Sequence, residues 1–360
     1  MRHRASKGTA MEIKSSFGNY AVTSVETTDE LLRILETESF DGVLIDSYIN
    51  KTIFKSHTIM QQLPRHVLDA SEEAKQYHNL EGIFEWLADS NFSRNSTLLA
   101  IGGGATQDIA TFISGTFHRG IKWTYVPTTL LSQADSCIGG KCGINLGTLK
   151  NQIGIVYPPS RILTNSEFLT TLPADDLVSG LGEILKICVT GQNQFWEEYK
   201  DLVGKKSVFE LDYKRLTELA LLAKKYVIEI DELELDYRRV LNYGHTIGHA
   251  IEAASDFRIA HGIGVILGIK VISILGEIWG VTPPELAAEI INEANNLLAL
   301  NSKPIEFSID RAVDMLAHDK KTSNGAATFI VLSGIGQHEF VKKTLDPNLK
   351  EEVRSALHAL

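Results

Sequence analysis

The stretch AIGGGATQDIATF, residues 100–112, decides the fold of the first half of the chain. Apolar residues typical of a β-strand run into three glycines, Gly102 to Gly104, and a helical pattern follows that carries Asp108 in its first turn. Glycines at such a turn let backbone N–H groups approach a pyrophosphate at the helix N-terminus. The third glycine of the G-x-G-x-x-G dinucleotide pattern is absent, so a simple tight turn between strand and helix is an equally good interpretation.

An alternation of strands and helices surrounds this turn. We expect a helix at LEGIFEWLADS (80–90) and strands at YAVTSV (20–25), GVLIDS (42–47), TLLAIGGG (97–104) and WTYVPTT (123–129). Strands separated by helices predict βαβ units and a parallel sheet. Asp46 ends one of these strands, where a carboxylate is placed to bind ribose hydroxyls, although acidic strand ends are also common without a ligand.

Long amphipathic patterns dominate the second half of the chain. Segments 211–229 and 285–300 have helical periodicity, and ATFIVLSGIG (327–336) is the one late β-like run. The proline of the motif TLPADD is a reasonable domain boundary. The sequence therefore predicts an α/β domain over residues 11–172 and a mostly helical domain over residues 173–360.

Composition and charge narrow the classes of function. The 360 residues include 45 acidic and 35 basic side chains, for a net charge of −10 without a sustained Lys/Arg run, which argues against a nucleic-acid partner. Anionic small molecules are compatible, because a few local lysines can outweigh the overall charge. Since no stretch approaches about 20 uninterrupted apolar residues, and the N-terminus lacks the apolar core of a signal peptide, we expect a cytoplasmic protein without a membrane segment. Cys137, Cys142 and Cys188 lack zinc-knuckle spacing and are expected to be reduced.

The segment 126–154 carries polar groups in an otherwise apolar stretch. Its sequence, VPTTLLSQADSCIGGKCGINLGTLKNQIG, contains adjacent threonines, Asp135, the glycine-flanked Lys141 and a Lys-Asn pair that ends at Asn151. Glycine-rich loops that present lysine suit phosphate or polyhydroxyl ligands. A polar loop with solvated charges is the alternative.

A further charged pair lies in SGLGEILKICV, where Glu183 and Lys186 are three residues apart on one face of a predicted helix. Such a pair usually lies on a surface, but Leu, Ile and Val surround this one. A carboxylate buried in that setting needs a cation or a metal ion beside it.

Three histidines lie close together in LNYGHTIGHAIEAASDFRIAHG, residues 241–262. His245 and His249 share a helix face at i, i+4, which is the usual way to present two imidazoles to one metal ion, and a further His or Glu would complete a three-ligand site. His261 follows twelve residues later. The stretch lacks the glutamate of the H-E-x-x-H zinc proteases, so that reaction is disfavoured. The spacing predicts a metal site but leaves open which two of the three histidines bind.

The order of these motifs resembles that of 3-dehydroquinate synthase and its relatives, the sugar phosphate cyclases. The resemblance rests on GGG with the following aspartate, PTTLL, DSCIGGKCGIN, KNQIG, SGLGEILK, and LNYGHTIGHAIE with the later HG. It extends from about Gly42 to the DKK motif near Lys320, which is most of the chain. Each motif alone is unspecific, but six of them in this order are highly specific.

The resemblance implies an N-terminal Rossmann-like domain that binds NAD and a C-terminal, mostly helical domain that binds a divalent metal ion, zinc or cobalt, with the active site in the cleft between them. Family members are commonly homodimers. The implied metal ligands are Glu183, His245 and His261. The implied NAD contacts are Asp46, Glu72, Lys75, Gly103, Gly104, Asp108, Thr128 and Thr129. The implied phosphate and substrate contacts are Arg119, Asp135, Lys141, Asn151, Lys186, Lys224, Arg238, Asn242, His249 and either Lys320 or Lys321, with Arg119 reaching the site of the partner subunit.

The implied reaction is a phosphate-eliminating cyclisation without net redox change, catalysed by a carbon–oxygen lyase. Bound NAD oxidises a ring hydroxyl of a sugar phosphate, phosphate is eliminated, the hydride returns, and an intramolecular aldol addition closes the new ring. Lys224 and Arg238 match the positions that grip the substrate carboxylate in dehydroquinate synthases. The expected substrate is therefore 3-deoxy-D-arabino-heptulosonate 7-phosphate, which the shikimate pathway of aromatic amino acid biosynthesis converts to 3-dehydroquinate.

The chain departs from the family pattern at several positions. GGGVxGDLxGF is GGGATQDIATF here, so Gln107 and Thr111 replace two glycines where NAD and a helix are expected to approach closely. KTGIN is KCGIN, and HGEAV is HGIGV, with Ile263 in place of a carboxylate. These changes leave the implied ligands intact and alter the groups that surround them.

Three other functions are compatible with these residues. A cyclase of a specialised, secondary-metabolite pathway would act on another sugar phosphate. A metal-dependent alcohol or polyol dehydrogenase shares the glycine turn and the helical metal domain, but its metal set usually includes an aspartate and its reaction would accumulate NADH. A non-catalytic NAD- or metal-binding regulator is the third, although the implied catalytic set is essentially complete.

Overall fold

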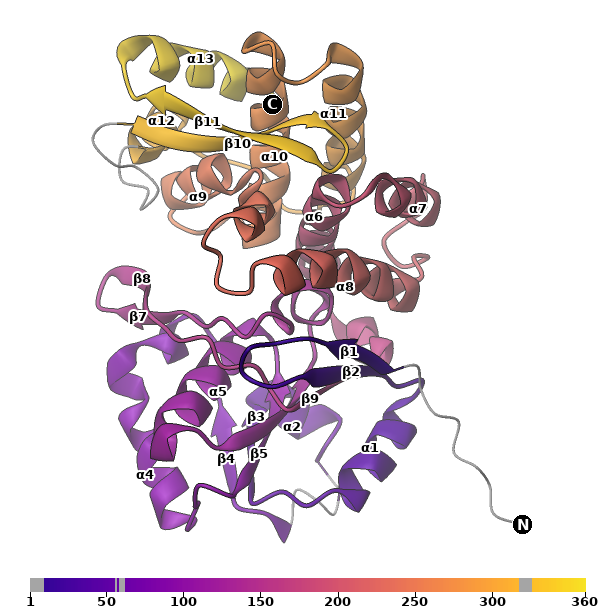
Figure 1. Ribbon diagram of the computed structural model, residues 1–360, viewed down its shortest axis with the longest axis vertical. Helices are drawn as coiled ribbons and strands as arrows, with labels where there is room; N and C mark the ends of the chain where they lie inside the picture. Colours follow the sequence, from indigo (N-terminus) through magenta and orange to yellow (C-terminus); the bar gives the residue numbers. More distant parts are fainter. Residues whose placement is uncertain (1–9, 56, 58–61, 317–325) are drawn as a thin grey trace. The chain divides into compact units, whose positions relative to one another are not determined.

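The structure is a computed structural model that describes residues 10–55, 57, 62–316 and 326–360. The chain divides into two compact units with the boundary between Thr171 and Leu172. We describe each unit by itself and call them the N-terminal and the C-terminal unit (Figure 1).

A mainly parallel, seven-stranded sheet forms the centre of the described N-terminal unit. The spatial order is β1-β2-β9-β6-β5-β3-β4, in which β1 and β2 are antiparallel and the other neighbours run parallel. The strand bounds are β1 (Ala10–Ile13), β2 (Tyr20–Ser24), β3 (Gly42–Asp46), β4 (Arg65–Leu68), β5 (Thr97–Gly102), β6 (Lys122–Pro127) and β9 (Arg161–Thr164). The central strand β5 is apolar and buried after its first residue, Thr97, because both faces of the sheet are covered, as is usual for parallel sheets.

Helices and short turns connect these strands. An apolar core that includes Leu31, Leu35, Val43, Ile45 and Leu99 joins α1 to the sheet. The helical elements are α1 (Thr28–Thr37), α2 (Ser47–Thr52), η1 (Glu73–Lys75), η2 (Tyr77–Asn79), α4 (Glu81–Asp89), α5 (Gly104–Thr116), η3 (Phe117–Arg119), the π-helical η4 (Ser132–Ser136) and η5 (Ser166–Thr171), and a small hairpin pairs β7 (Ile144–Leu146) with β8 (Leu149–Ile153).

The register of the parallel strands gathers one set of turns at one edge. Ile45 on β3 pairs with Ile101 on β5, and Gly102 pairs with Pro127 on β6. Asp46 and the glycine turn therefore lie at the same carboxyl-terminal edge of the sheet, where ligands bind in open α/β folds.

Helices make up most of the C-terminal unit. They are α6 (Ala174–Thr190), α7 (Asn193–Val203), α8 (Tyr213–Ile230), η6 (Tyr237–Asn242), α9 (His245–Ala254), α10 (His261–Ile278), α11 (Pro284–Leu298), α12 (Ile309–Met315) and α13 (Pro347–His358). The predicted late β-like run is confirmed as β10 (Ala326–Gly334), but a second strand, β11 (Gln337–Thr344), pairs with it and was not predicted. The sequence of β11, QHEFVKKT, is mostly polar and none of its residues is buried, so a search for apolar runs does not detect it.

The central helix of this unit is α10. Among the described residues, α10 is the helix whose length and composition would allow it to cross a membrane. However, 78% of this segment is buried inside the structure, as in the core helix of a folded domain.

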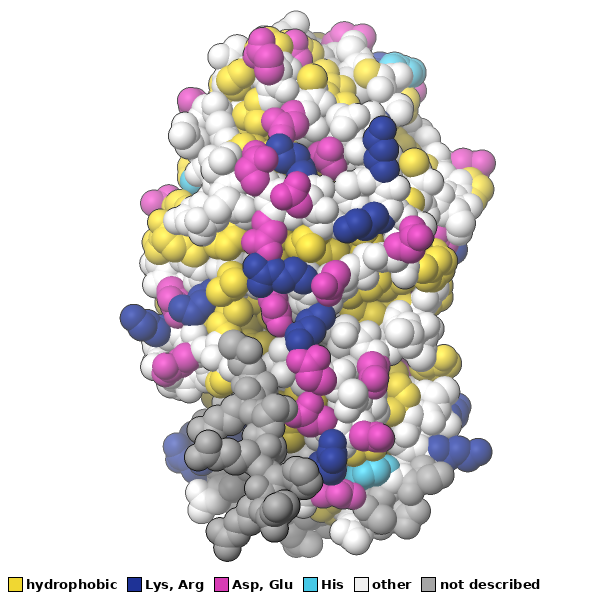
Figure 2. Space-filling model, turned by 90° about the vertical axis from the view of Figure 1, so that its right-hand side faces the viewer, with side chains coloured by type: hydrophobic (Ala, Val, Ile, Leu, Met, Phe, Trp, Pro, Cys, Tyr) yellow, Lys and Arg dark blue, Asp and Glu magenta, His cyan; other side chains and the backbone are white. Residues whose placement is uncertain are grey.

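Figure 2 shows one outer face of the molecule, on which basic, acidic and hydrophobic side chains are intermixed.

Glycines let α6, α9 and α10 approach each other closely. A methyl group at Gly262 would overlap the carbonyl oxygen of Ser179, and one at Gly268 would overlap that of Gly244 and lie 2.8 Å from the nitrogen of Gly248. We call these contacts the glycine seam. The seam brings the backbones of these three helices together near Glu183 on α6, His245 on α9 and His261 on α10.

We predict that Gly268→Ala destabilises the C-terminal unit. The added methyl group has no room against α9, and overpacking of this kind costs about 1–3 kcal/mol. Gly82→Ala in α4 is the control, because nothing lies within 4 Å of a methyl group there, and it should stabilise by about 0.4–1 kcal/mol. Urea unfolding followed by circular dichroism measures both, and equal stabilities for the two variants would contradict the seam.

Candidate functional site

Glu183 on α6 is the centre of a polar cluster inside the C-terminal unit. Its side chain is 1% exposed. One carboxylate oxygen accepts a hydrogen bond from the Lys186 ammonium, one turn later on the same helix. The other oxygen, Oε1, lies 3.1 Å from Nε2 of His261 and 3.6 Å from Nε2 of His245. Three separate segments thus place one buried carboxylate oxygen opposite two imidazole nitrogens.

Hydrogen bonds on the far side of each ring fix these two imidazoles. Nδ1 of His245 lies 3.2 Å from the carbonyl oxygen of Tyr243, and Nδ1 of His261 lies 2.9 Å from Oε1 of Glu252. When Nδ1 carries the proton toward an oxygen, the lone pair of Nε2 is directed at Glu183. A carboxylate oxygen and two imidazole nitrogens suit zinc or cobalt and leave a further coordination position open.

His249 offers an alternative third ligand. Its ring is 5.3 Å from that of His245 and 5.6 Å from that of His261, and donor atoms of the three histidines lie within 4.8 Å of one another. His249 is exposed, whereas Glu183 is buried and oriented by Lys186. A buried carboxylate has more to gain from a cation than an exposed imidazole has, so the donor set with Glu183 fits a metal ion better.

The electrostatics of His261 support this choice. Burial lowers the pKa of the imidazole, but the hydrogen bonds and charges of Glu183 and Glu252 outweigh burial and raise it to about 10. The two carboxylates therefore keep a second proton on the imidazole of His261 in the metal-free protein. A divalent cation would replace that proton, as is usual when protein ligands bind metals.

The other predicted substrate contacts of this unit are mainly buried cations. Lys186, Lys224 and Arg238 are each at most 5% exposed. Arg238 donates its backbone N–H to Oδ2 of Asp231 at 3.0 Å and its guanidinium to the carbonyl oxygen of Glu232. Buried cations in an acidic chain suit an anionic ligand. Lys320 and Lys321 lie outside the described residues.

Asn242 has a partner that sequence reasoning missed. Its side-chain amide donates to Oε1 of Glu234 at 2.5 Å. Glu234 adopts a left-handed backbone conformation. The predicted phosphate contacts Arg119 and Asn151, and His118 beside Arg119, do the same. Non-glycine residues pay a steric cost in this region, and such residues cluster at functional sites.

Buried hydrogen bonds hold the glycine turn in the N-terminal unit. The Tyr125 hydroxyl donates to the carbonyl oxygens of Gly102 at 3.0 Å and Gly103 at 3.1 Å, and Thr128 N–H donates to Gly102 at 3.0 Å. A methyl group at Gly103 would lie 2.9 Å from the Thr129 side chain. The turn is therefore held in one conformation up to Gly104, the first residue of α5. A methyl group at Gly104 would have no neighbouring atom within 4 Å, so the space beside it is open.

Lys75 connects the predicted NAD and phosphate contacts of this unit. Its ammonium is buried and lies 2.8 Å from Asp108, 2.9 Å from Oδ1 of Asn151 and 3.4 Å from Glu72. Burial lowers the pKa of Lys75, but Asp108 and Glu72 outweigh it and raise the pKa, so the side chain stays charged. The structure brings these four predicted residues together.

Asn145 completes this network and was not among the predicted residues. Its amide donates to Oε1 of Glu72 at 2.8 Å, and its oxygen accepts from the backbone N–H of Asn151 at 2.8 Å. Asn145 belongs to the GIN part of the KCGIN motif. A buried asparagine in a motif is the signal that could have identified it.

The remaining predicted contacts have local structural partners. Asp46 caps α2 by accepting from the N–H groups of Tyr48 at 2.9 Å and Ile49 at 3.1 Å. Lys141 forms an isolated β-bridge with Val156, and Asp135 lies in η4.

Gln107 does not fill the open side of the glycine turn. Its side-chain amide donates to the carbonyl oxygen of Ser136 at 2.6 Å and accepts from the Ser136 hydroxyl at 2.6 Å. This pair ties α5 to η4. The departure from glycine therefore adds a brace between two segments, while Thr111 is buried within α5.

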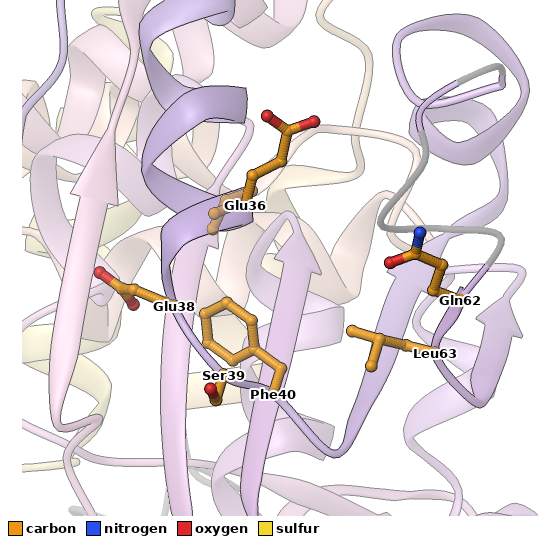
Figure 3. Close-up of a pocket in the computed structure, with 7 residues that line it drawn as sticks. Glu36, Glu38, Ser39, Phe40, Gln62 and Leu63 are labelled. Carbon is orange, nitrogen blue, oxygen red and sulfur yellow. The ribbon is translucent and has the colours of Figure 1, made fainter.

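A separate cavity of about 430 Å³ lies at the opposite edge of the sheet (Figure 3), where β3 and β4 begin. Oε1 of Glu36 lies 3.3 Å from Nε2 of His57, and Glu38 accepts from Arg161. The cavity is lined by Leu35, Glu36, Glu38, Ser39, Phe40, Gln62 and Leu63. Because it is far along the strands from Asp46 and Gly102, we assign it no part in the site.

Comparisons with known proteins bear on both units. A family model described as 3-dehydroquinate synthase N-terminal matches residues 65–179, and one described as 3-dehydroquinate synthase C-terminal matches residues 180–322. A 3-dehydroquinate synthase from Pelagibacter ubique is 35% identical over 329 residues, which cover 86% of this chain and 88% of the relative.

Solved structures of two related enzymes share the fold. A 2-deoxy-scyllo-inosose synthase complexed with carbaglucose-6-phosphate, NAD+ and Co2+ has a TM-score of 0.85 at 25% identity, over 96% of this chain and 100% of that chain. A 2-epi-5-epi-valiolone synthase from Streptomyces hygroscopicus with NAD+ and Zn2+ bound has a TM-score of 0.81 at 23% identity. The match covers 100% of this chain and 99% of that chain. The predicted fold class, an α/β unit followed by a mostly helical unit, is confirmed.

We predict that Lys75→Met destabilises the N-terminal unit by about 3 kcal/mol, the lower end for a broken buried ion pair. Burial raises the pKa of Asp108, so the unpaired carboxyl takes up a proton as the pH falls, and the loss relative to wild type should shrink from about pH 8 to about pH 5. Thermal unfolding at both pH values measures this. The control Lys122→Met removes an exposed lysine and should change little, and a pH-independent loss at Lys75 would contradict the pairing.

Proposed function

Since the chain belongs to the 3-dehydroquinate synthase family, we propose that it converts 3-deoxy-D-arabino-heptulosonate 7-phosphate to 3-dehydroquinate with elimination of phosphate. The enzyme is then an NAD- and divalent-metal-dependent carbon–oxygen lyase. The relatives with this name are more similar in sequence than the solved cyclases that form other rings, which supports this substrate.

The observation that carries the proposal is the position of Glu183 Oε1 opposite the Nε2 atoms of His245 and His261. These three groups would hold the metal ion. A bound zinc or cobalt ion supplies Lewis acidity that stabilises an alkoxide and polarises a ketone. Lys186 orients the carboxylate from the other side.

The N-terminal unit would hold NAD at the carboxyl-terminal edge of its sheet. We assign the N-terminus of α5, after the fixed turn at Gly103 and Gly104, to the pyrophosphate and Asp46, the last residue of β3, to the ribose. The further proposed contacts are Glu72, Lys75, Asp108, Thr128 and Thr129. When bound, NAD supplies a hydride acceptor that later returns the hydride, so no net oxidation results.

Buried cations would bind the two anionic ends of the substrate. We assign Lys224 and Arg238 to the carboxylate, because both are buried and Arg238 can contact two oxygens at once. The proposed phosphate and sugar contacts are Lys141, Asn151, Asn242, His249, Asp135, Lys186 and Arg119, with Arg119 acting across a homodimer and a lysine of the 320–321 pair joining them. The chain's own task in the elimination is to position the phosphate beside the acidified proton.

A related cyclase that acts on a carboxylate-free sugar phosphate is the second candidate. The structural likeness to 2-deoxy-scyllo-inosose synthase favours it. Lys224 and Arg238 argue for the first candidate, because these two buried cations match the positions that grip the substrate carboxylate in dehydroquinate synthases. We propose a cytoplasmic enzyme in either case.

We predict that the purified protein releases inorganic phosphate from 3-deoxy-D-arabino-heptulosonate 7-phosphate without accumulation of NADH. Phosphate release and absorbance of NADH are followed in one assay, and glucose 6-phosphate serves as the carboxylate-free comparison. Stoichiometric NADH would contradict the cyclase and indicate a dehydrogenase. Phosphate release from the comparison substrate alone would indicate the second candidate.

We predict that His245→Ala abolishes both metal content and turnover, whereas His249→Ala retains the metal ion and loses turnover. The difference follows from the assignment of His249 to the substrate. Metal analysis after gel filtration and the phosphate assay measure the two quantities. Loss of metal from the His249 variant, with metal retained after Glu183→Gln, would contradict the proposed ligands.

We predict that Lys224→Met lowers kcat/KM about 10- to 150-fold, the equivalent of one charge-assisted hydrogen bond of about 1.5–3 kcal/mol. Lys225→Met is the matched control, because the neighbouring lysine pairs with Glu229 on the same helix at 2.9 Å. Steady-state kinetics measure both variants. Equal kcat/KM values in the two variants would remove Lys224 from the substrate site.

A further inference from the structure

Glu252 hydrogen-bonds His261 and is the last residue of the motif LNYGHTIGHAIE, in which it has no assigned role. It lies on α9, two turns after His245, and its side chain is 12% exposed. Its Oε1 lies 2.9 Å from Nδ1 of His261, while Nε2 of the same ring faces Glu183 at 3.1 Å. The imidazole thus has a carboxylate at each ring nitrogen, from Glu183 on α6 and Glu252 on α9.

Gly264 on α10, which lies between the two seam glycines Gly262 and Gly268, makes the space for this side chain. A methyl group at Gly264 on α10 would lie 2.9 Å from Cγ and 3.1 Å from Oε1 of Glu252. Its next neighbour would be the carbonyl oxygen of Gly248, at 3.2 Å. The 2.9 Å contact is too short for a methyl group, so a larger residue at position 264 would force the Glu252 side chain to shift. Gly264 and Glu252 are therefore complementary across the α9–α10 crossing.

We propose that Glu252 is a positioning residue for the metal site and that Gly264 is the gap that allows it to reach His261. This inference rests on the proposed function, which makes His261 a metal ligand. Glu252 fixes the proton on Nδ1 and the rotation of the ring, so that the Nε2 lone pair is directed at the position shared with Glu183. Partners of this kind commonly contribute about 10- to 100-fold to metal affinity.

A positioning role of Glu252 differs from simple packing in its effect on the metal ion. A packing role would lower stability without changing the ligands of the ion. A positioning role changes metal affinity and the ligand field, and it makes the effects of the two residues depend on each other, because Gly264→Ala acts through Glu252.

The test uses the full chain and Zn2+ or Co2+ alone as the probe. Competition with a chromophoric chelator measures zinc affinity, and the visible absorption of bound Co2+ reports the ligand geometry. Glu252→Ala should lower zinc affinity about 10- to 100-fold and change the cobalt spectrum. Glu252→Gln should lose less, since its amide oxygen can still accept from Nδ1 of His261. Unchanged affinity and spectrum in Glu252→Ala would overturn the proposal.

Gly264→Ala should weaken zinc binding in the wild-type background and have no additional effect on affinity in the Glu252→Ala background. Gly276→Ala is the matched control, because a methyl group there also lacks room on α10 but meets Thr282 and Val331 instead. This control should lower the thermal stability of the metal-free protein and leave zinc affinity unchanged. Additive effects of the Glu252 and Gly264 changes, or an equal loss of affinity in Gly276→Ala, would overturn the proposal.

The wild-type protein separates this inference from the proposed function. If wild type binds neither ion, the metal-dependent function fails. If wild type binds zinc and the Glu252 and Gly264 variants bind it equally well, only the positioning role fails.

Discussion

The buried carboxylate of Glu183 is the interaction on which the C-terminal unit depends. An ionised carboxylate at 1% exposure is costly unless cations or hydrogen-bond donors surround it. Lys186 supplies one partner from the same helix, and α9 and α10 supply an imidazole each. The glycine seam is what lets these backbones come close enough. The arrangement is completed most favourably by a divalent cation, which accepts all three donors at once.

In the N-terminal unit, hydrogen bonds rather than a metal ion orient the groups that would bind a ligand. Backbone N–H groups at the start of α5 can bind an anion only if the turn before them is held in place, and Tyr125 holds its carbonyl oxygens. Lys75 in turn joins Asp108 to the β7–β8 hairpin through Asn151. In both units the groups that would meet a ligand are oriented by buried partners. Preorganisation of this kind limits the reorganisation that binding requires.

Much of this could be predicted from the sequence, because local patterns carry it. Strand and helix periodicity gave the two-part organisation, and the ordered motifs identified the family. Glu252, Asn145 and Glu234 were missed, because each is defined by a contact with a residue elsewhere in the sequence, and Glu234 also by its backbone conformation. Glu252 meets His261 only because α9 and α10 cross with Gly264 at the contact. Likewise, Gln107 could be recognised as a departure, but its brace to Ser136 required the structure.

The most direct test of the central claim is a crystal structure of the zinc-loaded protein with the ion located by its anomalous scattering. The account predicts one carboxylate oxygen of Glu183 and the Nε2 atoms of His245 and His261 at about 2.0–2.2 Å from the ion. An ion bound through His249, with Glu183 still paired to Lys186 and beyond coordination distance, would contradict it.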